Sequence, residues 1–173
     1  MLGSSFGVIG YTLLFVFPFV MAFAAVTDLL TMKIPNLLTL GLGVAFLVAA
    51  PIAGLTWSEI LSHLAAGSSM LLVGILLFSF GLVGGGDAKL LAAAALWLGF
   101  EPLVAFLAYV AVFGGALAIV ILAYRSVPAG AFPLPDWAAR LHVKGEGMPY
   151  GVAIAAGALA IYPSTTWYAM LAA

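Results

Sequence analysis

Apolar residues run almost without interruption along this chain, and a few polar clusters divide them into six segments. Most segments have the roughly 20 residues that a helix needs to cross a hydrocarbon core of about 30 Å. The predicted spans are residues 6–27, 37–55, 60–83, 88–101, 103–124 and 150–171. We therefore predict an all-α integral membrane protein with six transmembrane helices, forming one domain over residues 1–173.

The fourth segment is the exception in length. Its apolar part, residues 90–100, is too short to cross the core as a straight helix. Either Asp87–Lys89 and Glu101 lengthen it, or it is a partial span buried among its neighbours. The sequence leaves both alternatives open and predicts a short fourth span.

Basic residues give an independent check on the number of spans, because Lys and Arg gather in cytoplasmic loops. With six spans and an outside N-terminus, every basic residue of the chain falls on the cytoplasmic side: Lys33, Lys89, Arg125, Arg140 and Lys144. The first span, which has no basic residue before it, is expected to be retained rather than cleaved as a signal sequence.

Local signals place the boundaries of several elements. Pro35 suits a helix start, and Thr56 with Glu59 has the spacing of a capping box. Residues 125–149 form the only long loop, where we expect a short interfacial helix over residues 136–144 with Trp137 and Leu141 on its apolar side. Close helix packing is expected at the small residues Gly41, Gly43, Gly114, Gly115 and Ala92–Ala95.

Composition narrows the functional classes. The chain is 66% hydrophobic and 6% charged, so it cannot cover a water-facing surface. No basic cluster is available for nucleic acid. Cysteine is absent, which excludes disulfides, thiolate metal sites and a cysteine nucleophile. His63 and His142 are isolated, so we expect no metal site and no cofactor.

Two carboxylates are the candidate chemistry. Asp28 lies at the end of the first span and Asp87 at the end of the third, so the predicted topology puts both at the same membrane face. Carboxylates held close together share a proton, so one can activate water while the other polarises a peptide carbonyl. The residues Gly84, Gly85 and Gly86 lack Cβ atoms and leave room, and backbone N–H groups, for an extended peptide.

Simpler interpretations exist for each residue taken alone. Asp87 is then a helix cap that accepts hydrogen bonds from N–H groups two or three residues further on, and Asp28 is a boundary residue. The glycines are then a linker, Lys33 and Lys89 mark topology, and Tyr150 is either an interfacial anchor or part of the site.

The combination resembles the prepilin peptidases, membrane aspartyl proteases of the Gly-x-Gly-Asp type. The motif is Gly84-Gly85-Gly86-Asp87, extended by Lys89. Asp28 followed by Lys33-Ile34-Pro35-Asn36 looks like the region of the other catalytic aspartate, and Met148-Pro149-Tyr150-Gly151 is also similar to the family. The resemblance implies that Asp28 and Asp87 are catalytic, and that Lys33, Pro35, Asn36, Lys89 and Tyr150 shape the site.

The resemblance also implies a biological setting. The substrates would be pilin precursors, whose basic leader is cut at the cytoplasmic face of the bacterial inner membrane, just before the pilin's hydrophobic segment. The pilus assembly machinery is a candidate partner. The cytoplasmic domain with paired cysteines found in bifunctional members is missing. The chain therefore looks like the short form of tight-adherence (Flp-type) pilus systems, without N-methyltransferase activity.

Two other classes remain open on the sequence. A small cation- or proton-coupled transporter would use the same two carboxylates, although no internal repeat is evident. A non-catalytic assembly subunit would leave the glycine and aspartate motif unexplained.

Overall fold

The computed structural model describes residues 8–127, 134–143 and 147–172, and these ranges contain helices and no strand. This confirms the predicted all-α class. The α-helices are α1 (Val8–Thr31), α2 (Asn36–Ile52), α3 (Trp57–Ser79), α4 (Gly85–Leu98), α5 (Leu103–Ser126), α6 (Asp136–His142), α7 (Tyr150–Ile161) and α8 (Thr166–Ala172). A short 3-10 turn, η1 (Tyr162–Ser164), joins α7 to α8.

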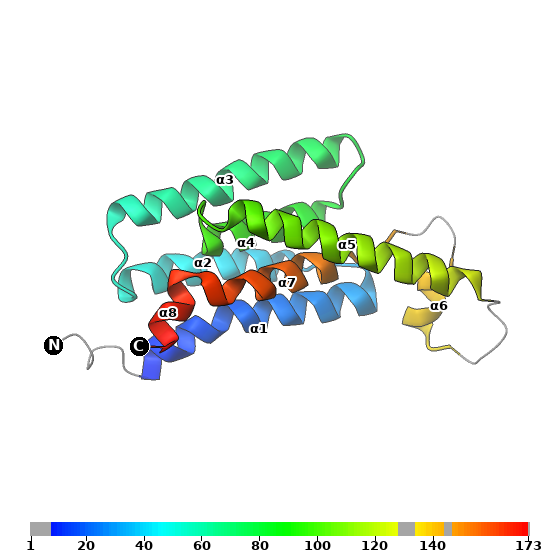
Figure 1. Cartoon of the computed structure of the whole chain (residues 1–173), viewed down its shortest axis with the longest axis horizontal. Helices are drawn as coiled ribbons and strands as arrows, with labels where there is room; N and C mark the ends of the chain where they lie inside the picture. Colours follow the sequence, from blue (N-terminus) through cyan, green and yellow to red (C-terminus); the bar gives the residue numbers. More distant parts are fainter. Residues whose placement is uncertain (1–7, 128–133, 144–146, 173) are drawn as a thin grey trace.

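The long helices lie lengthwise and alternate in direction along the chain, as Figure 1 shows. In the described part of the chain, α3 and α5 are long and apolar enough to cross a membrane, whereas α2 and the apolar stretches Phe15–Thr31 and Tyr150–Ser164 are shorter. The number of spans and the outside N-terminus therefore stay predictions.

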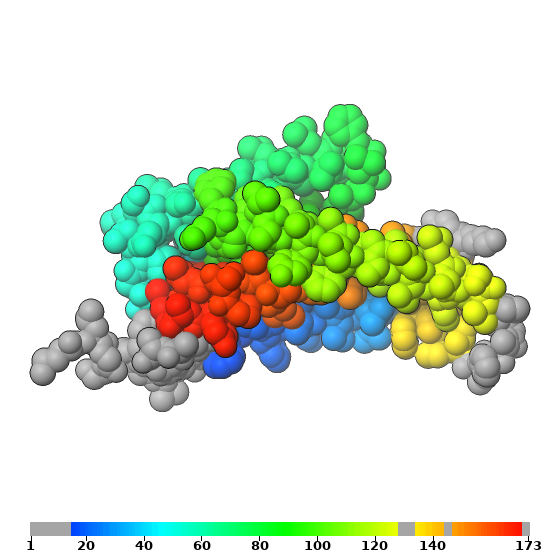
Figure 2. All heavy atoms as spheres, viewed as in Figure 1, coloured from blue at the N-terminus to red at the C-terminus, as the bar shows by residue number. Residues whose placement is uncertain are grey.

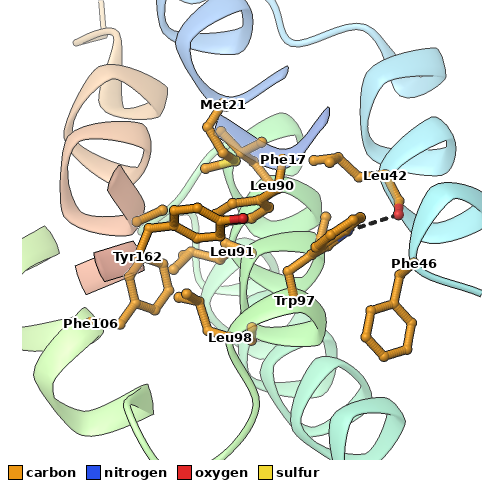
Figure 3. Close-up of a cluster of buried hydrophobic side chains, with 14 of the residues drawn as sticks. Phe17, Met21, Leu42, Phe46, Leu90, Leu91, Trp97, Leu98, Phe106 and Tyr162 are labelled. Carbon is orange, nitrogen blue, oxygen red and sulfur yellow. Dashed lines mark hydrogen bonds between the residues drawn. The ribbon is translucent and has the colours of Figure 1, made fainter. Parts of the chain in front are cut away.

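Helix α4 is the centre of the bundle. Most of its side chains are buried, and it packs against α2, α3 and α7. The core gathers around it in Figure 3, where the indole N–H of Trp97 donates to the carbonyl of Leu42 at 2.9 Å. Phe17 and Phe46 pack against the same indole ring. A helix buried on every side needs an apolar residue at nearly every position, which is what residues 90–98 provide.

The boundaries of α1 and α4 correct the predicted spans. Helix α1 continues for one turn beyond residue 27, so Asp28 lies inside the helix, and Met32 ends it with a φ of 56°. Helix α4 begins at Gly85 and ends at Leu98, before Gly99 with a φ of 78°. The short segment is therefore lengthened at its Asp87 end only. The glycines begin the helix instead of forming a linker, with Gly84 as the N-cap and Gly85 and Gly86 in the first turn.

The last predicted span is interrupted. Instead of one helix over residues 150–171, α7 ends at Ile161 and the chain turns through η1 into α8. Pro163 lies in that turn, and a proline has no N–H to continue an α-helical ladder.

The capping box is confirmed, since Thr56 and Glu59 bond each other's backbone N–H at the start of α3.

Glycine packing differs from the prediction. A Cβ at Gly41, Gly43 or Gly115 would meet no atom within 4 Å, so the predicted close packing at these residues is wrong. At Gly114 it is confirmed, because a Cβ there would lie 2.5 Å from the Tyr150 hydroxyl. Ala92–Ala95 are buried, as expected. Helices α3 and α4 pack closely at two glycines that the sequence analysis missed, Gly67 and Gly74, where a Cβ would lie 2.9 Å from the Cβ of Leu96 or Ala88.

Enlarging Gly74 should weaken this contact. A Cβ there would lie 2.9 Å from the Cβ and 3.1 Å from the Cα of Ala88, so backbone must move. We expect Gly74→Ala to lower the free energy of unfolding by about 1–3 kcal/mol, the usual cost of overpacking. Gly115→Ala, in open space on α5, is the matched control and should be neutral or slightly stabilising. Thermal unfolding in detergent measures both, and equal melting temperatures for the two variants would contradict the packing argument.

Helix α6 confirms the short helix predicted in the long loop, although Lys144 lies outside the described residues. Together with the end of α5 it extends beyond the other helices (Figure 2). The Arg125 Nε donates to the carbonyl of Leu141 at 2.8 Å, and the Tyr124 hydroxyl donates to the carbonyl of Ala138 at 3.1 Å. The Arg140 guanidinium donates to the Leu30 carbonyl near the end of α1. The loop is therefore fastened beside the end of α1 that carries Asp28.

Candidate active site

Asp28 is buried in the last turns of α1, with 5% of its surface exposed. Its Oδ2 accepts a hydrogen bond of 2.7 Å from the backbone N–H of Gly151. Gly151 is in the first turn of α7, where backbone N–H groups have no partner within their own helix. The carboxylate therefore caps a neighbouring helix, and the positive end of that helix's dipole favours a negative charge there.

Asp87 likewise binds the N-terminus of a helix, but it belongs to that helix, α4. It is the third residue of the helix, half-buried, and its carboxylate accepts a hydrogen bond from the backbone N–H of Gly84, the N-cap residue. This is the return bond of a capping box. The simpler interpretation expected a bond from N–H groups further along the chain, and the observed partner instead lies three residues before Asp87.

Packing between α4 and α7 brings the two carboxylates together. Both helices begin at the same end of the bundle and pack along each other, as Figure 1 shows. The N-terminus of α7 donates a hydrogen bond to Asp28, and the N-terminus of α4 donates one to Asp87. The charges of Asp28 and Asp87 are close enough to interact electrostatically. Both aspartates therefore lie at the same end of the bundle, whereas their common membrane face stays a prediction.

Both aspartates line one cavity of about 1260 Å³. Its walls come from four chain segments, namely the end of α1, residues 32–36, residues 81–87 and residues 147–150. We call this cavity the aspartate cleft. A cavity larger than the roughly 300–1000 Å³ of small-molecule pockets has room for a stretch of polypeptide.

The glycine run has two separate functions in this geometry. A Cβ at Gly84 would lie 2.8 Å from the Asp87 Oδ2, so glycine leaves room for that carboxylate to fold back onto its N–H. A Cβ at Gly86 would lie 3.2 Å from the Cβ of Ile34, so glycine here lets α4 approach the residue 33–36 segment. The N–H of Gly84 is thus occupied by Asp87 and is not free for a substrate, contrary to the sequence-based expectation.

Most of the other predicted site residues reach the aspartate cleft. Its lining includes all three glycines of the run and four further predicted residues: Gly84, Gly85, Gly86, Lys33, Pro35, Asn36 and Tyr150. Tyr150 is half-buried there and packs against Gly114 of α5, and its role in the site stays a prediction. Lys89 does not line the cleft. Its Nζ donates to the Asn36 Oδ1 at 2.9 Å and so joins α4 to the start of α2.

Gly151 is the residue of the site whose role the sequence analysis missed. A Cβ there would lie 2.8 Å from the Asp28 Oδ2 and 2.8 Å from the Ile34 Cδ1. The sequence analysis names Gly151 only within the stretch that resembles the family. Its bond to Asp28 could not be predicted, because the two residues are 123 positions apart. The one signal in the sequence is a glycine directly after Pro149 and Tyr150, at the predicted start of a span.

Among the described residues, no group of three or more His, Cys, Asp or Glu side chains could hold a metal ion. The expectation of a site without metal or cofactor stays a prediction. The carboxylates themselves are held by backbone donors, Gly151 for Asp28 and Gly84 for Asp87.

Comparison with known proteins agrees with this geometry. The sequence profile of the type IV leader peptidase family matches residues 15–119, which include both aspartates and the glycine run. The chain belongs to the type IV leader peptidase family. No curated protein and no solved structure matches it.

Membership in the type IV leader peptidase family makes the chain a leader peptidase-like protease, with prepilins in general as its substrates. The family is membrane-embedded, and α3 and α5 of this member are long and apolar enough to span a membrane. The matched region ends within α5, before Tyr150 and Gly151. The bond between Gly151 of α7 and Asp28 therefore comes from the structure alone.

Proposed function

We propose that this leader peptidase is an aspartyl endopeptidase that removes the basic leader from type IV prepilin-like precursors, with Asp28 and Asp87 as the catalytic pair. The observation that carries the proposal is that both carboxylates line the aspartate cleft and interact electrostatically there. Membership in a peptidase family indicates that the reaction is peptide-bond hydrolysis. The two aspartates in the cleft can catalyse this reaction as a general acid and a general base.

The mechanism follows from two carboxylates that share one proton. The ionised carboxylate takes a proton from a water molecule as that water attacks the carbonyl carbon of the scissile peptide bond. The protonated carboxylate donates a hydrogen bond to the carbonyl oxygen. As the tetrahedral intermediate collapses, a proton passes to the leaving nitrogen, the C–N bond breaks and the pair returns to its starting state. The two groups titrate as a unit, so acid and base belong to the pair.

The backbone bonds to the two aspartates support this chemistry. Each carboxylate has two oxygens with about four acceptor positions, and one backbone N–H occupies only part of that capacity. Asp28 and Asp87 are therefore held in place by helix N-termini while acceptor positions stay available for water. Groups that are already oriented need no costly rearrangement at the moment of reaction.

The basic residues support the proposed orientation. Within the described ranges, Lys33, Lys89, Arg125 and Arg140 lie at the end of the bundle that holds the aspartates, whereas Glu59 and Glu101 lie at the opposite end (Figure 1). Cytoplasmic ends of membrane proteins carry the excess of Lys and Arg. The aspartate cleft would thus open at the cytoplasmic face of a bacterial inner membrane, in a chain of six spans.

The test is cleavage of a precursor by the purified protein. The wild-type chain in detergent is incubated with a prepilin-like precursor, and the masses of the fragments are measured. We expect one cut, at the end of the basic leader and before the apolar segment. An intact precursor, together with proton or cation flux through the protein in liposomes, would overturn the proposal in favour of a transporter.

A further inference from the structure

A second cavity, of about 460 Å³, runs along helices α2, α3 and α4 beside the aspartate cleft. The α4 wall consists of Lys89, Ala92, Ala93 and Leu96, which have the spacing i, i+3, i+4, i+7. Residues at this spacing form one stripe along a helix. The α4 wall of the cavity therefore follows the helix axis for about 10 Å, at 1.5 Å per residue.

The other two walls repeat the spacing. Four residues of α2, from Asn36 to Gly43, and four of α3, from Leu64 to Leu71, line the cavity at the same i, i+3, i+4, i+7 positions. Three stripes on three helices thus face one channel, which we call the three-helix groove. Side chains around its walls are mostly apolar or small, and among the described residues only Lys89 brings a charge to its lining.

The groove has the shape of a bundle that lacks a helix. Helices α2 and α3 each pack on α4 but make little contact with one another. They are joined by residues 53–56 at the far end and diverge toward the end of the bundle that holds the aspartates (Figure 1). Apolar stripes at this spacing are what a further apolar helix needs for packing. Gly43, where a Cβ would meet no atom within 4 Å, would let that helix approach closely.

The groove borders the aspartate cleft at Asn36. Asn36 lines both cavities, and Lys89, which bonds to Asn36, is two residues from Asp87 in the same helix. A substrate chain that left the cleft past Asn36 would reach the groove at the end where α2 and α3 diverge. The bonded pair Lys89 and Asn36 marks the boundary between the two.

We propose that the three-helix groove binds the apolar helix that follows the scissile bond of the precursor. This inference rests on the proposed function, since it takes the cleft as the place of cleavage. The first two turns of the substrate helix would complete a four-helix arrangement with α2, α3 and α4. The groove then determines where cleavage occurs, because a helix seated against Gly43 and Leu96 fixes the distance from the apolar segment to the aspartates.

Two glycines of α2 provide a matched pair of variants. A Cβ meets no atom within 4 Å at either Gly43 or Gly41, so both tolerate a larger side chain, but only Gly43 lines the groove. Two substrates are compared, the full precursor and a short peptide that ends before the apolar segment. We expect Gly43→Leu to raise KM for the full precursor about tenfold, the effect of a moderate packing clash, with kcat little changed. Cleavage of the short peptide by this variant, and both reactions of Gly41→Leu, should match the wild type.

The outcomes separate the two proposals. Suppose that the wild type cleaves the precursor. If Gly43→Leu then has the same KM for the precursor as the wild type, or if its cleavage of the short peptide is impaired as much as its cleavage of the precursor, the groove proposal is overturned and the proposed function stands. If the wild type cleaves neither substrate, the proposed function fails and the groove proposal with it.

Cross-linking gives a second readout that does not depend on turnover. A photoreactive benzoylphenylalanine is placed at Leu71, which lines the groove, or at the neighbouring Leu72, which does not, in a chain carrying Asp87→Asn. We expect Leu71 to form an adduct with the precursor and Leu72 to form none. With precursor at saturation, an adduct of Leu71 to lipid or to a second copy of the chain, instead of precursor, would overturn the proposal.

Discussion

Asparagine in place of either Asp28 or Asp87 is expected to slow leader release by about 10³-fold or more, because it removes one member of a general acid/base pair. Asparagine has nearly the same shape as aspartate, and its side-chain oxygen can still accept the N–H of Gly151 or Gly84. The fold should therefore survive while the proton transfer is lost. Fragment masses over a long time course measure the rate.

Asp136 provides the control for this pair. It lies exposed in the first turn of α6 and does not line the aspartate cleft. Asp136→Asn removes the same charge from the chain and should leave the rate within about twofold of the wild type, as expected for a surface change. If Asp28→Asn or Asp87→Asn, shown to be folded by thermal unfolding, cleaved as fast as Asp136→Asn, that aspartate would not be catalytic.

Gly151→Ala is expected to have the second-largest effect, about 10²-fold on kcat, which is the cost of displacing a catalytic group by about 1 Å. The added Cβ would lie 2.8 Å from the Asp28 Oδ2, closer than real Cβ contacts. The nearest atoms are the ends of the Asp28 and Ile34 side chains, which can rotate away. Stability should therefore change little while the carboxylate loses its position. The measurement is kcat for precursor cleavage beside the melting temperature.

Gly147→Ala is the matched control, since Gly147 lines the same cleft but a Cβ there would lie 3.7 Å from the Met32 Cε, an ordinary contact. It should keep nearly full activity. A Gly151→Ala variant with normal kcat would show that the Gly151 bond does not position Asp28. A large loss of stability would instead assign Gly151 to helix packing.

The sequence was sufficient to predict the aspartate pair, because that prediction needed only the order and direction of the helices. Asp28 lies near the end of the first helix and Asp87 at the start of the fourth, so alternating helix directions bring them to one end of the bundle. The glycines before Asp87 were also a local signal. Their role as the first turn of α4 follows from the N–H of Gly84 bonding the Asp87 carboxylate.

Features that depend on distant contacts were not predictable. The bond between Gly151 and Asp28 joins residues 123 apart, and no local pattern marks it. Glycines that pack, such as Gly74, and glycines that face open space, such as Gly41, look alike in a sequence, because only the neighbouring helix distinguishes them. The limits of α4 were uncertain for a related reason, since a helix that is apolar on every side has no periodicity to read.

The measurement that tests the paired-aspartate account most directly is leader release by the double variant Asp28→Asn/Asp87→Asn, compared by fragment mass with both single variants and the wild type. Residues that act as one catalytic unit show strongly non-additive losses. The account predicts that the double variant is no slower than the slower single variant. Losses that multiply would contradict it, because they would show that Asp28 and Asp87 contribute independently.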